Sequence, residues 1–573
     1  MLEALKDRPR RTVHIGRWAI PSLLLCVAAS GAAAWSQQSA PATQPTPPAA
    51  TAKPSTNNPS ARFTGKITPE QAQQLFALVD ELIKFSSDET GLPIKSTVKR
   101  TLTTRTAVES YLEEKFNEDA GAKRLQRDEV VLRKFGLLDR DFELKPFLLA
   151  LLKEQIEAYY DSKTKTVNIL DWVDPDQQKT VMAHELTHAL QDQYADLEKW
   201  DDQTPDDVSH DAAGDQDNLA RDEMDTARDA VAEGQATAVM IDYNLKPVGM
   251  SLVKDPEVLD KFRSDTAANE DSPVMSRAPL LLSESMLFPY REGLSFEQDI
   301  WMDKGQTAAF SGALDRPPTS SWEILNPRVY EQRQIPAIPL LPNIHPLVDP
   351  LYTPYDIGQI GELDVHIITE LFGGDNSSRD LTPAWDGGLY WAGQLRTATT
   401  PEQQASTKSI GLFYLSVWKS ADSAQVFAGL YAKNLARKYS SVQLQASANL
   451  SPAADGGSNS VTREQIYTTD EGPVVITTRG KLVFVAESFP LPLARKLTAL
   501  ILDAQGGGAL RMTSLPPRPV DPASSRRSSE MNTEMSVARS GESGTLSGDL
   551  VHFFGDCGVM KASVDAELRA ISR

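Results

Sequence analysis

The pentapeptide His184-Glu185-Leu186-Thr187-His188 has the H-E-x-x-H arrangement of residue types. Residues four apart lie on one face of an α-helix, so the two imidazoles would point toward one position. Two imidazole nitrogens suit a tetrahedral zinc ion, and Glu185 would then lie beside the water that zinc activates. The alternative is a solvated helix with two surface histidines. The chain contains only seven histidines, and two of them stand in this motif, which favours the zinc interpretation.

The residues around the motif predict the helix that would hold it. Asp174-Pro175-Asp176-Gln177 has the pattern of an N-cap, a proline at the first helical position and a glutamine three residues after the cap. The two histidines share a stripe with Val181 and Gln191, and a mostly apolar stripe lies beside it. We therefore expect a helix that buries one side and presents its histidines to a cleft.

A β-hairpin is predicted directly before this helix. Residues 155–160 and 166–170 have the composition of two strands, and residues 161–164 supply the turn. Further upstream, a helix with one apolar face is predicted to begin after Thr68.

A catalytic zinc site needs a third protein ligand. The longer form H-E-x-x-H-x-x-G-x-x-H is absent, because Gln191 stands at its glycine position and Tyr194 at its third histidine. Glu233 is the better candidate, since it is the central acid of an apolar, small-residue helix predicted over residues 229–243. A buried carboxylate needs a metal or a cationic partner, so a structural ion pair is the alternative role for Glu233.

Two histidines from H-E-x-x-H and a glutamate on a later helix, in a Glu-Gly-x-Ala context, resemble the gluzincin group of zinc metallopeptidases, which includes thermolysin. The resemblance covers residues 150–245. It implies that His184, His188 and Glu233 bind one Zn2+ ion and that Glu185 is the general base. It also implies a zincin-like domain in which an edge strand of the hairpin lies over the cleft and pairs with an extended substrate.

The chain departs from thermolysin-like enzymes in two ways. The interval between His188 and Glu233 is longer, and Thr237 stands where those enzymes carry an aspartate one turn after the ligand glutamate. Asp229, one turn before Glu233, is an open alternative as the group that orients a histidine.

The donor that would stabilise the oxyanion is not set by the motif. Residues 289–296 and 317–327 resemble segments of uncharacterised exported bacterial proteins that also carry an H-E-x-x-H helix. A Pro-Tyr-Arg-x-Gly turn holds its side chains rigidly, so Tyr290 and Arg291 are the first candidates for a catalytic role. The remaining candidates are His210, Tyr159 and Tyr160.

Composition and the chain start bear on localisation. A formal net charge of −20 argues against non-specific binding of nucleic acid and against a preference for anionic membranes. Residues 1–37 combine a basic stretch, an apolar run and small residues, which predicts a cleaved signal peptide; an uncleaved membrane anchor is the alternative. Only Cys26 and Cys557 are present, so no disulfide framework is expected. These features predict an exported, periplasmic or secreted bacterial protein with no membrane span after signal cleavage. The resemblance to the metallopeptidases implies a peptide or protein substrate.

The chain is predicted to be an α+β protein. A disordered linker at 38–64 precedes a zincin-like, mainly helical catalytic domain with a small edge-strand sheet at 65–333, a connector and helix at 334–374, and a smaller α+β domain at 375–504. Residues 505–573 are predicted to form a mostly disordered tail. In the smaller domain we expect strands at 410–418, 465–467, 474–476 and 482–485, and helices at 421–438 and 491–503.

An acidic stretch separates the two parts of the predicted metal site. Residues 196–229 contain thirteen Asp or Glu against three Lys or Arg. Such a run is typical of a solvated loop, with a calcium site as an open alternative.

The leading prediction is an exported zinc metallopeptidase that hydrolyses peptide bonds. The alternatives are a catalytically inactive binding or scaffold protein with a peptidase fold, and a zinc amidase that acts on cell-wall peptides. Glu185 argues against the scaffold, because a purely structural zinc site does not need that base.

Overall fold

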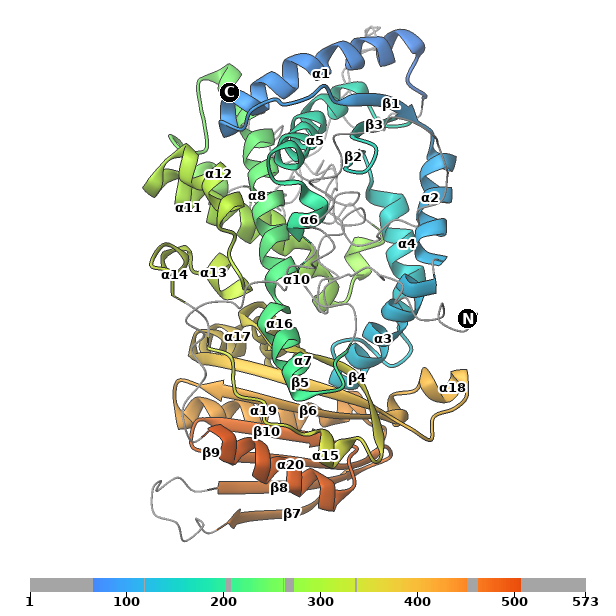
Figure 1. Cartoon of the computed structure of the whole chain (residues 1–573), viewed down its shortest axis with the longest axis vertical. Coiled ribbons are helices and arrows are strands. Elements are labelled where there is room, and N and C mark those ends of the chain that lie inside the picture. Colours follow the sequence, from blue (N-terminus) through green and yellow to red (C-terminus); the bar gives the residue numbers. More distant parts are fainter. Residues whose placement is uncertain are drawn as a thin grey trace, which may run out of the picture.

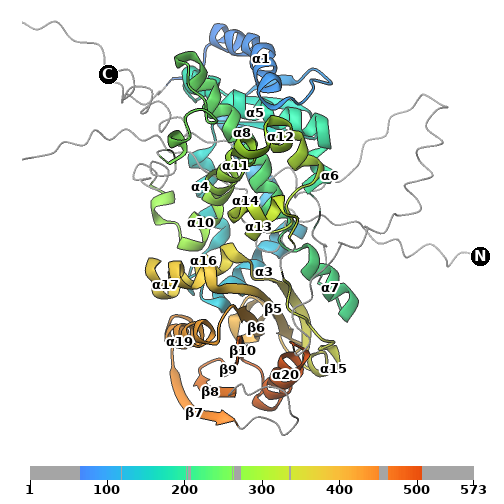
Figure 2. The same cartoon turned by 90° about the vertical axis from the view of Figure 1, so that its left-hand side faces the viewer.

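The computed structural model describes residues 65–505, apart from 118, 202, 204–207, 261, 263–272, 335–336 and 451–461. The predicted signal peptide and linker, and the predicted tail from residue 506 onward, lie outside these residues. The protein is mixed α and β, in agreement with the α+β class at this level. A mainly helical part with a small sheet lies above a larger sheet (Figures 1 and 2). Within the described residues, no helix combines the length and apolarity that crossing a bilayer requires.

The helical part begins with the small sheet and the helices that surround it. Its helices are α1 (Pro69–Thr90), α2 (Arg105–Asn117), α3 (Asp119–Phe135), α4 (Leu144–Gln155), α5 (Pro175–Ala195), α6 (Leu197–Asp201), α7 (Ala212–Arg221), α8 (Met224–Leu245), α10 (Leu280–Phe288), α11 (Leu294–Lys304), α12 (Gln306–Asp315), α13 (Ser321–Leu325) and α14 (Pro327–Glu331). A π-helical turn, η3 (Pro289–Gly293), joins α10 to α11. The sheet has the strand order β1 (Lys99–Thr103), β3 (Thr166–Leu170), β2 (Ala158–Asp161). Strand β3 is parallel to β1 and antiparallel to β2, so the predicted hairpin is present and β2 is an edge strand.

The first strand of the hairpin is shorter than predicted. Helix α4 continues to Gln155, so β2 begins only at Ala158. The turn forms where predicted, because Asp161 accepts hydrogen bonds from the backbone N–H groups of Lys163 and Thr164. The side chain of Gln178 then bonds to both the N–H and the C=O of Leu170, which ties the end of β3 to the first turn of α5.

Helix α5 begins as the sequence predicts and is buried more completely than predicted. Asp174 caps it by accepting a hydrogen bond from the N–H of Asp176, and Pro175 occupies the first turn. Its residues from Thr180 to Asp192 are all buried. Helices α1 and α8 pack against it, and Ser86 of α1 donates a hydrogen bond to the carbonyl of Ala183. The motif helix is therefore held on several sides rather than on one.

The larger sheet has seven strands, each antiparallel to its neighbours. Their order is β4 (Tyr352–Gln359), β5 (Trp385–Leu395), β6 (Ile410–Trp418), β10 (Leu482–Glu487), β9 (Gly472–Arg479), β8 (Thr462–Thr469), β7 (Val442–Leu450). The associated helices are α15 (His345–Val348), α16 (Glu362–Gly373), α17 (Asp375–Leu381), α18 (Pro401–Gln404), α19 (Ala421–Lys438) and α20 (Leu491–Ala504). Strand β4 lies within the residues expected to form a connector, and β5 and β7 were not predicted. The predicted strands and helices of residues 410–503 are present.

Alternating side chains place the two long helices on opposite faces of this sheet. Val483 and Val485 of β10 join the same hydrophobic cluster as α19, whereas Phe484 and Ala486 join that of α20. Side chains alternate between faces along a strand, so α19 and α20 must cover different faces. Figure 2 shows them on either side of the sheet. Because both faces are covered there, the central strands β6 and β10 are buried along almost their whole length.

Helix α3 joins the helical part to the larger sheet through buried charges. The ammonium group of Lys134 lies 2.8 Å from a carboxylate oxygen of Glu471 and donates to the hydroxyl of Ser488 at 2.7 Å. A second buried pair, Lys438 with Glu487, lies in the same region. Beside them the ring of Phe135 packs edge-on against Tyr390 of β5. Removing one partner of such a pair is expected to cost about 3–5 kcal/mol of stability, because the other charge stays buried.

The prediction of a solvated loop over residues 196–229 is wrong for its described part. Helices α6 and α7 and the start of α8 occupy it, and several of its acids are buried. Asp222 accepts a hydrogen bond from the backbone N–H of Gln359, and Glu223 accepts one from the hydroxyl of Ser321. Hydrogen bonds of this kind are what allow a carboxylate to be buried, and a count of charges does not reveal them.

Glu223 is buried where α8, α13 and α16 meet, near two half-buried acids, Glu362 and Asp364. Burial, followed by the charge of Asp364, raises the pKa of Glu223 to about 8. Burial also raises the pKa values of Glu362 and Asp364 to about 7. The folded chain therefore holds protons that the unfolded chain, with ordinary pKa values of 4.5 and 3.8, releases.

The stability of the protein is expected to fall as the pH rises through this range. These raised pKa values give stability that is complete below about pH 4 and is lost as the pH passes through about 7 to 8, by up to about 1.4 kcal/mol per pH unit for each acid. The melting temperature of Glu223→Gln, followed between pH 5 and 9, should decline less steeply than that of the wild type. Equal slopes for the two proteins would show that Glu223 does not hold a proton in the folded state.

Candidate metal centre

Helices α5 and α8 bring three ligand atoms together. His184 and His188 lie one turn apart on α5, and Glu233 comes from the middle of α8. The Nε2 atoms of the two histidines are 3.0 Å apart. The Oε2 atom of Glu233 lies 3.1 Å from Nε2 of His184 and 3.5 Å from Nε2 of His188. All three residues are at most 1% exposed, and together they form a group that could hold a metal ion.

The spacing of these atoms fits a small tetrahedral ion. Ligands at about 2.0–2.1 Å from a tetrahedral centre lie about 3.3–3.5 Å from one another. The observed separations of 3.0, 3.1 and 3.5 Å are close to that value. The donor set also matters, because imidazole nitrogen favours transition metals, whereas calcium and magnesium prefer oxygen ligands.

Glu185 is a fully buried acid beside the metal group. It is 0% exposed, and within the described residues no group meets hydrogen-bonding geometry at either carboxylate oxygen. Burial raises its pKa well above the ordinary value, against the opposing charge of His188. A carboxylate left in this state costs free energy unless something at the site binds it. Glu185 directly follows His184, one of the three residues that could hold a metal ion.

The electrostatics of the metal group favour a positive charge between its members. Burial works against ionisation of Glu233, but His188 and His184 outweigh it and lower the pKa of this carboxyl group well below its usual range. Burial likewise works against a charged His188, yet the charge of Glu233 outweighs it and raises the pKa of His188 to about 9. A metal cation supplies positive charge at this place without a proton.

Tyr290 lies in the site, and Arg291 is engaged elsewhere. The ring of Tyr290 stacks alongside that of His184, with centroids 6.4 Å apart and an angle of 25°. Burial, then the charges of Glu233 and Glu185, raise the pKa of its phenol well above the ordinary value. Arg291 instead forms an ion pair of 2.6 Å with Glu284, on α10. The structure thus brings the first of the two candidates to the metal group.

A contact between two glycines sets the distance between α8 and the turn that carries Tyr290. A Cβ atom at Gly234 would overlap the backbone of Gly293, and one at Gly293 would overlap the backbone of Ala230. The two backbones therefore touch directly, which places Tyr290 of η3 close to Glu233. A π-helical turn is an uncommon element that often accompanies functional sites.

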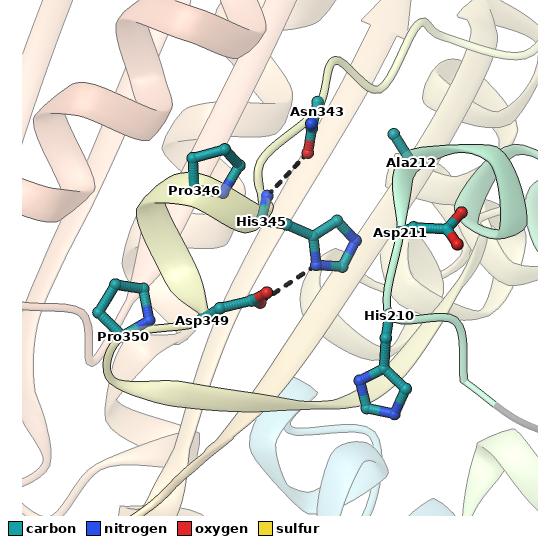
Figure 3. Close-up of a pocket in the computed structure, with 8 residues that line it drawn as sticks. All are labelled: His210, Asp211, Ala212, Asn343, His345, Pro346, Asp349 and Pro350. Carbon is teal, nitrogen blue, oxygen red and sulfur yellow. Dashed lines mark hydrogen bonds and ion pairs between the residues drawn. The ribbon is translucent and has the colours of Figure 1, made fainter.

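The other candidate donors have different roles. The hydroxyl of Tyr160 donates a 2.7 Å hydrogen bond to Asp192, and the ring of Tyr159 stacks on Tyr111. His210 is exposed and lines a separate pocket of about 590 Å³, where His345 bonds to Asp349 (Figure 3). Asp229, proposed to orient a histidine, raises the pKa of Tyr290 by its charge, after burial and the nearer acids.

Three buried polar residues near the metal group escaped the sequence analysis in this role. Gln191 lies 2.8 Å from Nδ1 of His188 and bonds to Gln235 of α8. Glu297 of α11 is fully buried, and burial raises its pKa well above the ordinary value, against a hydrogen bond from Gln235. The spacing of Gln191, three residues after His188, was the one signal available, since it puts both side chains on the same helix face.

Substitution of Gly234 by alanine is expected to disrupt the site. Alanine gains up to about 1 kcal/mol of helix propensity, but overpacking against backbone that cannot rotate away costs about 1–3 kcal/mol or more. We expect a lower melting temperature and weaker metal binding, measured by thermal unfolding and metal titration. The matched control is Gly429→Ala in α19, where an added Cβ meets nothing within 4 Å and should be neutral or stabilising. Equal stability of Gly234→Ala and the wild type would contradict the backbone contact.

Comparison of the chain with protein-family models, with curated proteins and with solved structures found no match. Functional inference therefore rests on the residues of the metal centre themselves.

Proposed function

We propose that the protein is an exported zinc metallopeptidase that hydrolyses peptide bonds, with a gluzincin-type site. In this proposal His184, His188 and Glu233 hold one Zn2+ ion, Glu185 is the general base, and Tyr290 is the donor to the oxyanion. The observation that carries the proposal is the convergence of three ligand atoms within 3.5 Å of one another, next to the buried carboxylate of Glu185. Export rests on the sequence of residues 1–37.

Zinc is the metal that this ligand set favours. Two imidazoles and one carboxylate around an open fourth position are a common ligand set of catalytic zinc sites. Bound there, zinc would act as a Lewis acid that polarises a carbonyl group and lowers the pKa of water to about 7.

Glu185 has the position and environment of a proton carrier. It directly follows His184, as the glutamate of the H-E-x-x-H pattern does, and in enzymes with this pattern that glutamate is the general base. Its pKa is raised by burial, which brings it closer to the working range of a general base. We propose that it takes a proton from water and later delivers it to the leaving amine.

The hairpin supports a peptide as the substrate. Strand β2 is the edge of its sheet and packs on α5, and the backbone of Tyr160 in β2 lies near enough to Glu185 to influence its pKa, after burial and the nearby charges. An edge strand beside the catalytic base suits an extended peptide, because main-chain hydrogen bonds can align it with the site. Selection among peptides would then depend on side-chain pockets.

Metal analysis of purified protein tests the proposal first. We expect about one zinc ion per wild-type chain, its loss in Glu233→Ala, and its retention in Glu185→Gln. The last variant should lose about 10²–10⁴-fold in peptide cleavage, because the proton carrier is gone while the ligands remain. Metal content by atomic emission and cleavage of a mixed peptide library would be measured on the same samples.

Each alternative role makes a different prediction in that experiment. Zinc bound with full affinity by Glu233→Ala would exclude Glu233 as a ligand. A wild type that binds zinc and cleaves nothing in the peptide library, while hydrolysing amide bonds of cell-wall peptides to acid and amine, would indicate an amidase. A wild type that binds no metal would contradict the proposal that the protein is a zinc enzyme.

Tyr290→Phe tests the oxyanion donor. The variant keeps the ring that stacks on His184, so zinc content and KM should change little, whereas kcat should fall about 10²–10³-fold. Tyr414→Phe in the larger sheet, which also removes a buried hydroxyl, is the control and should be fully active. An unchanged kcat in Tyr290→Phe would show that another group donates the hydrogen bond to the oxyanion.

A further inference from the structure

A chain of two side-chain amides runs from α12 to the metal group. Its distal member, Gln235 of α8, is fully buried. The Nε2 atom of Gln235 lies 3.0 Å from the backbone carbonyls of both Ala309 and Phe310. Carbonyl oxygens only accept hydrogen bonds, so the NH2 group of this amide must face α12. The Oε1 atom of Gln235 is therefore directed toward α5.

The orientation of the second amide follows from the first. Gln191 of α5 is also fully buried, and its Nε2 atom donates to Oε1 of Gln235 and to the carbonyl of Ala232, each at 2.9 Å. Both hydrogens of its NH2 group thus have acceptors. The remaining oxygen, Oε1 of Gln191, lies 2.8 Å from Nδ1 of His188.

The proton on His188 is fixed by this chain of amides. An amide oxygen can only accept, so Nδ1 of His188 must carry the hydrogen. In the neutral imidazole the lone pair is then on Nε2, the atom that lies 3.0 Å from Nε2 of His184 and 3.5 Å from Oε2 of Glu233. This is the form of histidine that binds a metal.

We propose that Gln191 and Gln235 form an amide relay that positions His188 for metal binding and selects its metal-binding tautomer. The inference rests on the proposed metal site and adds two positioning residues to it. Neither residue touches the metal position, and both act through His188.

The neutrality of the relay has a physical consequence. Carboxylates commonly orient metal-binding histidines. Here a carboxylate at position 191 would add a negative charge to a buried site that already contains Glu185 and Glu233. An amide holds the imidazole by the same kind of hydrogen bond without that charge, so the metal keeps more of its own positive charge.

Metal-binding measurements can distinguish a positioning role of Gln191 and Gln235 from a role in packing α5 against α8. A packing role predicts a change in melting temperature alone. A positioning role predicts a change in zinc affinity, measured by competition with a chelator, and in the visible absorption spectrum of the Co2+-substituted protein, which reports the geometry of the ligands. Full-length protein and four variants are required: Gln191→Leu, Gln191→Glu, Gln235→Leu and Thr237→Val.

We expect Gln191→Leu to weaken zinc binding by about 10–100-fold and to alter the cobalt spectrum. Gln235→Leu should act in the same direction by a smaller factor, although it does not touch His188. Gln191→Glu keeps an acceptor for Nδ1–H but places a charged oxygen against the acceptor oxygens of Gln235 and Ala232, so it should also weaken zinc binding. Thr237→Val is the control, because this buried hydroxyl on α8 has no hydrogen-bond partner within the described residues; its affinity and spectrum should be those of the wild type.

The outcomes distinguish this inference from the function on which it rests. A wild type that binds zinc and cobalt, with both leucine variants unchanged in affinity and spectrum, would overturn the relay and leave the metal site intact. A wild type that binds neither ion would overturn both. If Gln191→Leu fails to fold, Gln235→Leu tests the relay alone, because that variant keeps Gln191 but removes the hydrogen bond between Gln191 and Gln235.

Discussion

Two imidazoles and two carboxylates share a buried position between α5 and α8, and each would cost several kcal/mol without a partner. The surrounding backbone elements hold these four side chains close together, so that they can act as partners for one another. Helix α1 and the hairpin hold α5, and direct contact between Gly234 and Gly293 holds α8 against the turn that carries Tyr290. The ligand atoms therefore keep their separations because backbone elements, rather than flexible side chains, determine them.

The parts of the site that lie within one helix could be read from the sequence. The spacing of His184 and His188 is a property of any α-helix, and the N-cap at Asp174 defines where α5 begins. Glu233 was found because an acid in the middle of an apolar helix needs an explanation. Gln191 and Gln235 could not be paired in the same way, since their contact joins two helices 44 residues apart in sequence and depends on how those helices cross.

The same difference between local and long-range information appears in the larger sheet. Strand β6 and helix α19 have the bounds that their apolar patterns predict, because both are packed along their whole length. Strand β7 alternates apolar and polar residues from Val442 to Leu450, a strand pattern that the sequence analysis overlooked, although most of these residues are exposed. Strand β4 contains Pro354 at a register shift and follows a proline-rich stretch, which favoured a connector. Acids such as Glu223 were expected in solvent because their partners, Ser321 and the residues near Gly361, lie far along the chain.

The acids where α8, α13 and α16 meet make folding of this chain a reaction that takes up protons. Near neutral pH, the raised pKa values of Glu223, Glu362 and Asp364 keep a share of their protons in the folded state, and the unfolded chain gives these protons to the buffer. The heat measured on unfolding then includes the heat of protonating whichever buffer accepts them, which is opposite in sign to the ionisation heat of that buffer. Calorimetric enthalpies of this protein will differ between phosphate and Tris at the same pH, and only their extrapolation to zero buffer ionisation heat describes the chain itself.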